Sequence, residues 1–227
     1  MKRLDDLGRR YGVPVGGLAA ILELQASDPG ASTTVRDPAE AVDRHVADSL
    51  VALELDAVRS AGTVADLGSG AGWPGLALAA ALPDARVALV ESAARHCRYL
   101  ERAVAAGGLA NVDVVHARAE EWAAGIGVHD VVCARALAAL PVLCEYAAPL
   151  LADGGVLVAW KGTVPPEEAA AGERAAAILG LEPVHVRAVD PYPAAQRRTL
   201  HVYRKVAQTP ERFPRRPGMA VKRPLGT

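Results

Sequence analysis

The pattern that most restricts the possible folds begins at Thr63, where short apolar runs start to alternate with stretches of helical periodicity. Each run has the length of a buried strand, and turn residues separate it from the next helical stretch. Such alternation predicts a parallel sheet with helices on both of its faces. The predicted parallel strands are residues 63–67, 86–90, 112–116, 130–134 and 155–160.

Two further β-like runs, residues 184–189 and 199–206, are joined by a short loop that contains proline. We expect them to form an antiparallel hairpin at one edge of the sheet. The predicted fold class is therefore α/β and Rossmann-like, with a mostly parallel, seven-stranded sheet. A chain of 227 residues has room for one well-buried domain of this kind but not for a second large one.

Helical periodicity also precedes the sheet. Residues 13–25 and 39–57 are predicted to be helices, and the stretch between them is rich in turn residues. The predicted organisation is a small N-terminal helical cap over residues 1–58, a main domain over residues 59–207 and a basic, proline-rich tail over residues 208–227.

The tail concentrates positive charge. From residue 204 to residue 227, seven lysines and arginines stand against one acid, Glu211, although the whole chain has a net charge of −1. Four prolines interrupt this segment, so we expect it to be extended or disordered when alone rather than helical. A basic tail of this kind suits a polyanion, and a solvated tail that only aids solubility is an equally good interpretation.

Nothing in the sequence indicates export or membrane insertion. The first residues, MKRLDDLGRR, lack the apolar stretch of a signal peptide, and nowhere do 18 uncharged apolar residues run together, so we expect a cytoplasmic protein. The three cysteines, Cys97, Cys133 and Cys144, are an odd number without CxxC spacing. They argue against a disulfide framework or a zinc site and predict reduced, buried thiols.

A glycine-rich turn follows the first predicted strand and opens a helix, in the order Asp66, Gly68, Gly70, Gly72. Ligands of open α/β sheets bind at this edge, and glycines let the backbone approach them closely. With Gly75, the last two glycines also fit the GxGxxG spacing of dinucleotide-binding proteins. An acid two residues before the first glycine suits a cationic cofactor without pyrophosphate, and the chain lacks the substrate-binding mass of a nicotinamide enzyme. We therefore favour S-adenosylmethionine over a dinucleotide.

The ends of the next two strands supply further candidates for cofactor binding. Glu91 closes the second strand, where a carboxylate can accept hydrogen bonds from both ribose hydroxyls, or can instead cap the helix that begins near Ala93. Ala119 and Glu120 follow the third strand, where adenine contacts usually lie. Glu120 could equally be a solvated acid in the first turn of a helix.

The end of the fourth strand limits the chemistry. It reads Cys133-Ala134-Arg135-Ala136, not the Asn/Asp-Pro-Pro-aromatic sequence of enzymes that methylate exocyclic amines. Cys133 and Cys144 lie in apolar segments without a neighbouring base, so an activated thiolate is not expected. What remains is a substrate atom that is already nucleophilic, such as guanine N7. Arg135 could donate to a base edge, a phosphate or the cofactor, or could serve only in a structural ion pair.

Several motifs occur together in one order. They are Arg36-Asp37-Pro38, Arg44-His45 with Asp48-Ser49-Leu50, DLGSGAGWPG, Arg135-Ala136, Trp160-Lys161-Gly162 and PRRPGMAVKRPL. From about Ala31 to the end, the sequence resembles the bacterial 16S ribosomal RNA guanine-N7 methyltransferases, also called the glucose-inhibited division protein B family. It departs from the family pattern at Ser32-Thr33-Thr34, at Trp73 and at Arg197-Arg198-Thr199.

The resemblance implies a class I S-adenosylmethionine-dependent fold, with residues 59–207 as the methyltransferase domain. The reaction it implies is methyl transfer from S-adenosylmethionine to N7 of one guanosine in the 530 loop of 16S rRNA. It places cofactor contacts at Gly68, Trp73, Ala119, Glu120 and Arg135.

The resemblance also makes Lys161 and Arg198, together with Arg135, candidates for catalytic residues that hold RNA or orient the base. The implied partner is 16S rRNA or the small ribosomal subunit, with no metal and no membrane. The tail residues expected to contact RNA phosphates are Arg212, Arg215, Arg216, Lys222 and Arg223. His45 shares a helical face with apolar residues, so a satisfied core histidine is at least as good an interpretation as a functional one.

Three alternatives remain open at this point. A small-molecule S-adenosylmethionine-dependent methyltransferase would share the cofactor site but would not need the basic tail. A nicotinamide oxidoreductase would bind a dinucleotide instead, and an RNA-binding protein that has lost catalysis would bind neither ligand tightly.

Overall fold

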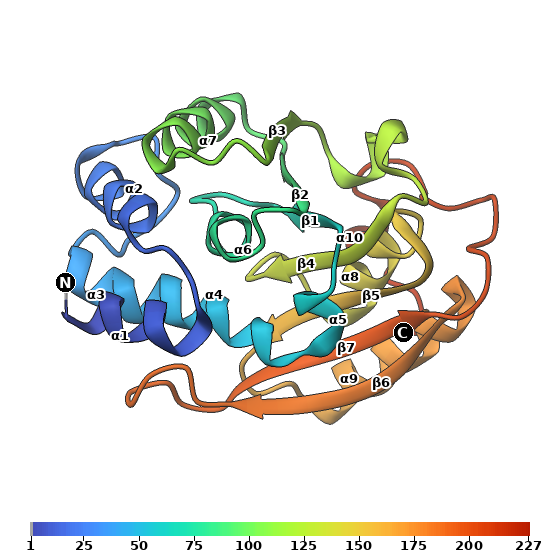
Figure 1. Ribbon diagram of the computed structural model, residues 1–227. Helices are drawn as coiled ribbons and strands as arrows, with labels where there is room; N and C mark the ends of the chain where they lie inside the picture. Colours follow the sequence, from blue (N-terminus) through green and yellow to red (C-terminus); the bar gives the residue numbers. More distant parts are fainter. Residues whose placement is uncertain (1) are drawn as a thin grey trace.

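The computed structural model describes residues 2–227, which form one seven-stranded sheet with helices on both faces (Figure 1). The spatial order is β3-β2-β1-β4-β5-β7-β6. The first five strands run parallel, and β7 runs antiparallel to both of its neighbours, β5 and β6. The strands are β1 (Thr63–Leu67), β2 (Arg86–Glu91), β3 (Val112–His116), β4 (His129–Arg135), β5 (Leu151–Lys161), β6 (Leu181–Val189) and β7 (Arg198–Lys205). The predicted fold class, including the antiparallel edge hairpin, is confirmed.

The inner strands match the predicted ranges closely, whereas β5 and β6 begin earlier than predicted. The additional residues are 151–154 in β5 and 181–183 in β6, in which Asp153, Gly154 and Pro183 interrupt the apolar pattern. Both segments lie where the apolar pattern is weak, because β6 is an edge strand whose residues are mostly exposed. Proline is tolerated there because an edge strand needs fewer ladder hydrogen bonds.

One face of the sheet is covered by α6, α7 and the helices that precede β1. Their buried side chains and those of the sheet form one hydrophobic core that includes Leu18, Val46, Leu76 and Leu100. The elements are α1 (Lys2–Tyr11), α2 (Gly16–Ser27), α3 (Pro38–Ala41), the π-helix η1 (Val42–Ala47), α4 (Asp48–Leu50), the 3₁₀-helix η2 (Val51–Glu54), α5 (Asp56–Arg59), α6 (Gly75–Ala81) and α7 (Ala94–Gly107).

These N-terminal helices differ from the sequence prediction in two ways. Helix α1 was not expected, because only two of its apolar side chains, Leu4 and Leu7, are buried in the core. The single helix predicted over 39–57 is instead a succession of short α, π and 3₁₀ segments. Its periodicity is helical overall, so the sequence pattern does not distinguish one winding from another.

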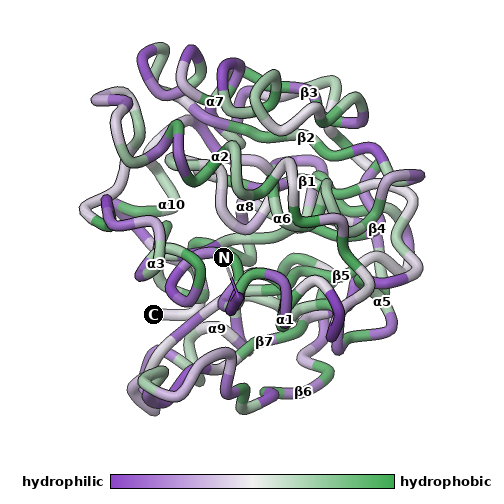
Figure 2. The backbone as a smooth tube through the Cα atoms, turned by 60° about the vertical axis from the view of Figure 1, so that its left-hand side comes forward, coloured by the Kyte–Doolittle hydropathy of each residue, from purple (hydrophilic) through white to green (hydrophobic). Residues whose placement is uncertain are grey.

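The opposite face is covered by α8 (Leu140–Ala147) and α9 (Pro166–Leu179), with a second core that includes Leu143, Leu157 and Phe213. Two 3₁₀-helices, η3 (Ala119–Glu121) and η4 (Ala123–Gly125), follow β3. Figure 2 shows the strongly hydrophobic residues along the strands in the middle of the sheet. The two cores meet across these strands, which are therefore buried on both faces.

The structure of the tail differs from the prediction. It was predicted to be extended or disordered when alone, yet it folds back onto α8 and contains the short helix α10 (Met219–Lys222). Phe213 and Ala220 are buried in this arrangement. The physical reason is long-range, because the tail supplies Arg215 as the partner of Glu145, a buried carboxylate of α8.

The structure also bears on membrane insertion and on the thiols. Across residues 2–227, every helix is too short or too polar to cross a membrane. Cys97, Cys133 and Cys144 are free and buried, as predicted.

Candidate functional site

The turn between β1 and α6 requires glycine at three positions. Gly68, Gly70 and Gly72 have φ values of 64°, 53° and 92°, in the left-handed region that favours glycine. A Cβ on Gly68 would also lie 2.6 Å from a methyl carbon of Leu137. Of the three glycines, Gly68 is exposed and Gly70 partly so, whereas Gly72 is buried and a Cβ there would clash with Leu76.

Asp66 lies beneath this turn. Its carboxylate is buried and accepts a hydrogen bond from the amide of Gly75, at 3.0 Å, while its carbonyl accepts one from the Ser69 hydroxyl. Burial raises the pKa of Asp66 to about 7, and the hydrogen bond from Gly75 opposes that shift. Asp66 thus fixes the start of α6 and the shape of the turn.

Two hollows meet at Gly68, at the carboxyl ends of the strands. The first, which we call the β2–β3 hollow, has a volume of about 100 Å³ and includes Ser92, Ala119, Glu120 and Tyr146 in its lining. The second, the β1–β4 hollow, has a volume of about 260 Å³. Its lining includes Ser32, His45, Gly68, Gly70, Trp73 and Arg135. Six of the nine predicted cofactor residues therefore line one or both of two hollows that share Gly68. The other three, Asp66, Gly72 and Glu91, line neither.

Glu91 lines neither hollow but binds the glycine turn beside them. One of its carboxylate oxygens accepts a hydrogen bond from the Gly70 amide at 3.0 Å, and the other accepts one from the Ala93 amide at 2.7 Å. The second contact is to the residue just before α7, and that helix has no side-chain cap hydrogen bond. The first contact joins Glu91 to the glycine turn.

Arg135 extends from the end of β4 into a charged cluster beside the β1–β4 hollow. It donates to a carboxylate oxygen of Asp48 at 3.0 Å and to the carbonyl of Arg44 at 3.1 Å. Asp48 is 2% exposed, and its other oxygen lies 3.5 Å from Nε of Arg198. A structural ion pair is thus present, but Arg135 also lines the hollow, so the two interpretations of this residue are compatible.

His45 joins the same cluster. Its Nδ1 lies 3.2 Å from the Arg135 guanidinium, its Nε2 lies 3.1 Å from the Thr33 hydroxyl, and its ring stacks on Trp73 with centroids 5.8 Å apart. Burial, followed by the charge of Arg135, lowers the pKa of His45 to about 3. The imidazole is therefore neutral at pH 7, and Arg135 as donor assigns the ring proton to Nε2. His45 is satisfied, as one interpretation expected, and it also lines the hollow.

The segment before α3 closes the β1–β4 hollow from above. Arg36 donates to the carbonyls of Gln25, Asp28 and Ala31 at 2.8, 2.7 and 3.1 Å. The Gln25 side chain accepts from the Trp73 indole at 2.7 Å and donates to the Val35 carbonyl at 3.0 Å. These contacts hold the segment that carries Ser32 against the glycine turn.

The three predicted catalytic cations lie at one edge of the sheet. Arg135 pairs in register with Trp160 on β5, and Lys161 pairs with Thr199 on β7, which places Arg198 close by. The Lys161 ammonium lies 2.7 Å from Glu168 and donates to the Ala138 carbonyl at 3.2 Å. Each cation therefore has a carboxylate nearby, Glu168 for Lys161 and Asp48 for the two arginines.

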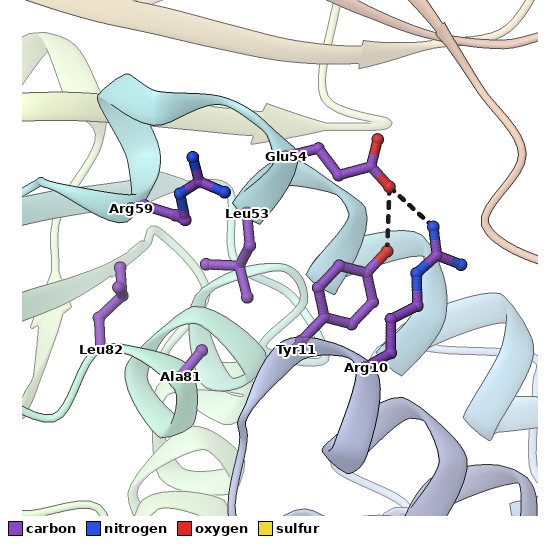
Figure 3. A pocket seen from close by; sticks show the side chains of 7 residues that line it. All are labelled: Arg10, Tyr11, Leu53, Glu54, Arg59, Ala81 and Leu82. Atoms are coloured by element: carbon purple, nitrogen blue, oxygen red, sulfur yellow. Dashed lines mark hydrogen bonds and ion pairs between the residues drawn. The ribbon is translucent and has the colours of Figure 1, made fainter.

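A larger hollow, of about 450 Å³, lies at the opposite edge of the sheet (Figure 3). It is bordered by residues that precede β1 and β2, so it lies near the amino ends of the strands. Its carboxylate, Glu54, already accepts hydrogen bonds from Arg10, Tyr11 and Arg187. The hollow is lined by Arg10, Tyr11, Leu53, Glu54, Arg59, Ala81 and Leu82. Open α/β sheets bind their ligands at the carboxyl ends of the strands, so this hollow does not lie where a cofactor is expected.

Sequence reasoning gave no role to Asp48, Gln25 and Ser32. Asp48 stands in one of the motifs of the family resemblance, and that motif could have indicated a functional role. Its pairing with Arg135 joins positions 87 residues apart, which no local pattern indicates. Gln25 carried no signal. No three His, Cys, Asp or Glu side chains within residues 2–227 gather as a metal ion would require.

Comparisons with known proteins agree with this geometry. The family model described as rRNA small subunit methyltransferase G matches residues 31–199. A protein of that name from Rubrobacter xylanophilus is 45% identical over 84% of this chain and 75% of the relative, and one from Chloroflexus aggregans is 40% identical over 85% of this chain and 82% of the relative.

Solved structures show the same fold at lower identity. The cofactor-bound Rv0187 protein of MTB has a TM-score of 0.57 and 20% identity, covering 85% of this chain and 90% of that one. The 16S rRNA (adenine(1408)-N(1))-methyltransferase from Catenulisporales acidiphilia has a TM-score of 0.54 and 23% identity, covering 67% of this chain and 91% of that one. By its family model and its relatives, the chain belongs to the rRNA small subunit methyltransferase G family.

Proposed function

We propose that this protein transfers a methyl group from S-adenosylmethionine to N7 of one guanosine in the 530 loop of 16S rRNA, in the cytoplasm. The observation that carries the proposal is the pair of hollows that meet at Gly68, with Arg135 at one end and Ala119 and Glu120 at the other. The family to which the chain belongs supplies the reaction class. We assign residues 1–58 as the helical cap, 59–207 as the methyltransferase domain and 208–227 as the tail.

The residues present fit the cofactor. Gly68 is exposed and lines both hollows, Gly70 lines one of them, and Glu91 holds the turn through the Gly70 amide. We propose that the β2–β3 hollow takes the adenosine and that the β1–β4 hollow takes the methionine end. The proposed cofactor-binding set is Asp66, Gly68, Gly70, Gly72, Trp73, Glu91, Ala119, Glu120 and Arg135, with Asp66 acting through the turn that it holds.

The chemistry requires positioning more than proton transfer. The cofactor supplies a methyl group on a sulfonium. The guanine N7 lone pair forms the new C–N bond, the S–CH₃ bond breaks, and its electron pair stays on sulfur as S-adenosylhomocysteine leaves. N7 carries no proton, so Arg135, Lys161 and Arg198 would act by holding RNA and orienting the base.

The cysteines support this reading over attack through a protein thiolate. Burial raises the pKa of both Cys133 and Cys144 above the ordinary thiol value. Such thiols are protonated at neutral pH and poor nucleophiles.

We propose that the exposed cations of the tail, Arg212, Arg216, Lys222 and Arg223, bind RNA phosphates. Arg215, the fifth cation in the predicted set, lies against Glu145 instead. Its guanidinium is already paired. The tail therefore contributes to RNA binding through its outer side, the side that carries the four exposed cations.

The test uses methyl-labelled S-adenosylmethionine and small ribosomal subunits from a strain that lacks its own enzyme. Labelled sites are then mapped by cleavage at N7-methylguanosine. We expect one labelled guanosine, in the 530 loop. Absence of label, despite demonstrated cofactor binding, would favour the small-molecule methyltransferase.

A further inference from the structure

The inner side of the tail makes a buried ion pair with α8. Nε of Arg215 lies 2.7 Å from one oxygen of Glu145, and Nη2 binds the other oxygen, so the guanidinium is bidentate. The Glu145 side chain is 1% exposed and that of Arg215 is 22% exposed. Nη2 also donates to the Arg223 carbonyl at 2.8 Å, which closes the tail into a loop around the pair. Bidentate pairs of this kind fix orientation as well as position.

A second contact joins the tail to η3. The amide of Gly218 donates to a carboxylate oxygen of Glu120 at 3.0 Å. Gly218 has a φ of 78°, and it immediately precedes α10. A backbone amide in the tail therefore fixes the side chain of a residue that lines the β2–β3 hollow.

Both contacts converge on one wall of that hollow. Glu145 is followed in α8 by Tyr146, which lines the hollow together with Ala119 and Glu120. Burial, then the charges of Glu120 and Glu145, raises the pKa of Tyr146, as expected for a hydroxyl close to both acids. Tail, helix and 3₁₀ turn thus form a single packed unit behind the hollow.

We propose that residues 213–223 are a positioning element for the cofactor's adenosine, and that Arg215 is the positioning residue through which this segment sets cofactor affinity. The inference rests on the proposed function, because it takes the β2–β3 hollow as the adenosine site. Arg215 does not line the hollow; it acts through Glu145 and through the path that it imposes on Gly218. The tail has two sides with two roles, an inner one toward the cofactor and an outer one toward RNA.

The experiment measures the dissociation constant of S-adenosylhomocysteine by calorimetry for full-length variants. We expect Arg215→Ala to weaken binding about tenfold or more and Arg215→Lys, which keeps one charged contact, to weaken it less. The matched control is Arg216→Ala, at the exposed neighbouring position, which should bind within twofold of the parent protein. In methyl-transfer assays, Arg215→Ala should raise KM for S-adenosylmethionine and leave kcat at saturation nearly unchanged.

Arg215→Ala leaves a buried carboxylate unpaired, so a second variant separates positioning from folding. Glu145→Gln combined with Arg215→Ala removes that charge but keeps the tail untethered. We expect the melting temperature of this double variant to lie closer to that of the parent protein than the melting temperature of Arg215→Ala does. Its affinity for S-adenosylhomocysteine should be as low as that of Arg215→Ala. A separate readout is the hydrogen exchange rate of the Gly218 amide. Bound S-adenosylhomocysteine should slow this exchange in the parent protein and in Arg216→Ala.

The outcomes separate the two proposals. If the double variant is folded and binds with the parent dissociation constant, the positioning role is wrong and the proposed function is untouched. If the parent protein itself does not bind S-adenosylhomocysteine, the proposed function fails and this inference fails with it.

Discussion

The two hollows share Gly68 but are walled by opposite ends of the chain. The β1–β4 hollow is closed by the segment before α3 and by the cluster of His45, Asp48 and Arg135. The β2–β3 hollow is backed by α8, η3 and the C-terminal tail. In the first wall, buried side chains that bind one another line the hollow directly. In the second wall, the buried pair of Arg215 and Glu145 lies behind the hollow, and the lining residue Glu120 accepts from a backbone amide of the tail.

This difference indicates what each wall is suited to do. A buried charge network has few alternative arrangements, so it holds a side chain such as Arg135 in one position. The second wall takes its shape from the docked tail, which does not itself line the hollow, so we expect it to act on affinity. Substitutions in the first wall should therefore affect folding and transfer, and substitutions in the second should affect binding.

The largest effect should come from Asp48→Ala. It leaves the buried Arg135 guanidinium without its carboxylate, and removal of one partner from a buried pair costs about 3–5 kcal/mol. Urea denaturation measures the loss. The control on the same helical stretch is Asp43→Ala, whose pair with Arg3 is exposed and should contribute less than about 1 kcal/mol. Similar losses for the two variants would mean that the cluster does not stabilise the first wall.

The next largest effect concerns transfer. Arg135→Ala should lower kcat/KM for ribosomal subunits by roughly 100-fold or more, because the base or the methyl donor loses a positioned donor. Arg135→Lys should recover stability through its charge beside Asp48 but little activity, since the fork geometry is lost. Arg216→Ala provides the comparison. Equal effects of Arg135→Ala and Arg216→Ala would contradict a distinct role for the first wall.

One pH effect should come from His45, in the first wall. The pKa of His45 is lowered from 6.5 to about 3, so the unfolded chain takes up a proton there before the folded protein does. This contribution to stability is fully present above pH 6.5 and is lost as the pH falls toward 3. At pH 5 the loss is about 2 kcal/mol. The measurement compares the free energy of unfolding of the parent protein and of His45→Gln between pH 7.5 and 5. If the two free energies change in parallel with pH, His45 does not contribute this effect.

The smallest effect should appear on the outer side of the tail. Arg216→Ala removes one proposed phosphate contact, so the slope of log Kd for RNA against log salt concentration should fall by about 1. Binding of S-adenosylhomocysteine should not change. An unchanged salt slope would place RNA elsewhere on the molecule.

Local sequence patterns were sufficient for the sheet and for the glycine turn. The central strands are buried on both faces, which produces continuous apolar runs that are visible in the sequence. The turn from Asp66 to Gly75 combines a strand end, special backbone angles and a helix start within ten residues, so neighbouring residues determine it.

The walls could not be predicted in the same way. Arg135 and Asp48 are 87 positions apart, and Arg215 and Glu145 are 70 positions apart. Neither pair produces a periodic pattern. The proline-rich composition of the tail predicts an extended chain, and only the buried carboxylate on α8 changes that outcome. Helix α1 was missed because its apolar face consists of little more than Leu4 and Leu7.

The π-helix Val42–Ala47 determines which way the first wall faces. A π turn accommodates about one residue more than an α turn. Ordinary α winding of the same residues, Val42–Ala47, would therefore turn Asp48 by up to about 100° relative to the residues before Val42. A change that restored α winding without removing a residue would thus leave Asp48, Arg135 and Arg198 all encoded and still separate the carboxylate from its two arginines. The spacing within this turn is as much a part of the site as the side chains are.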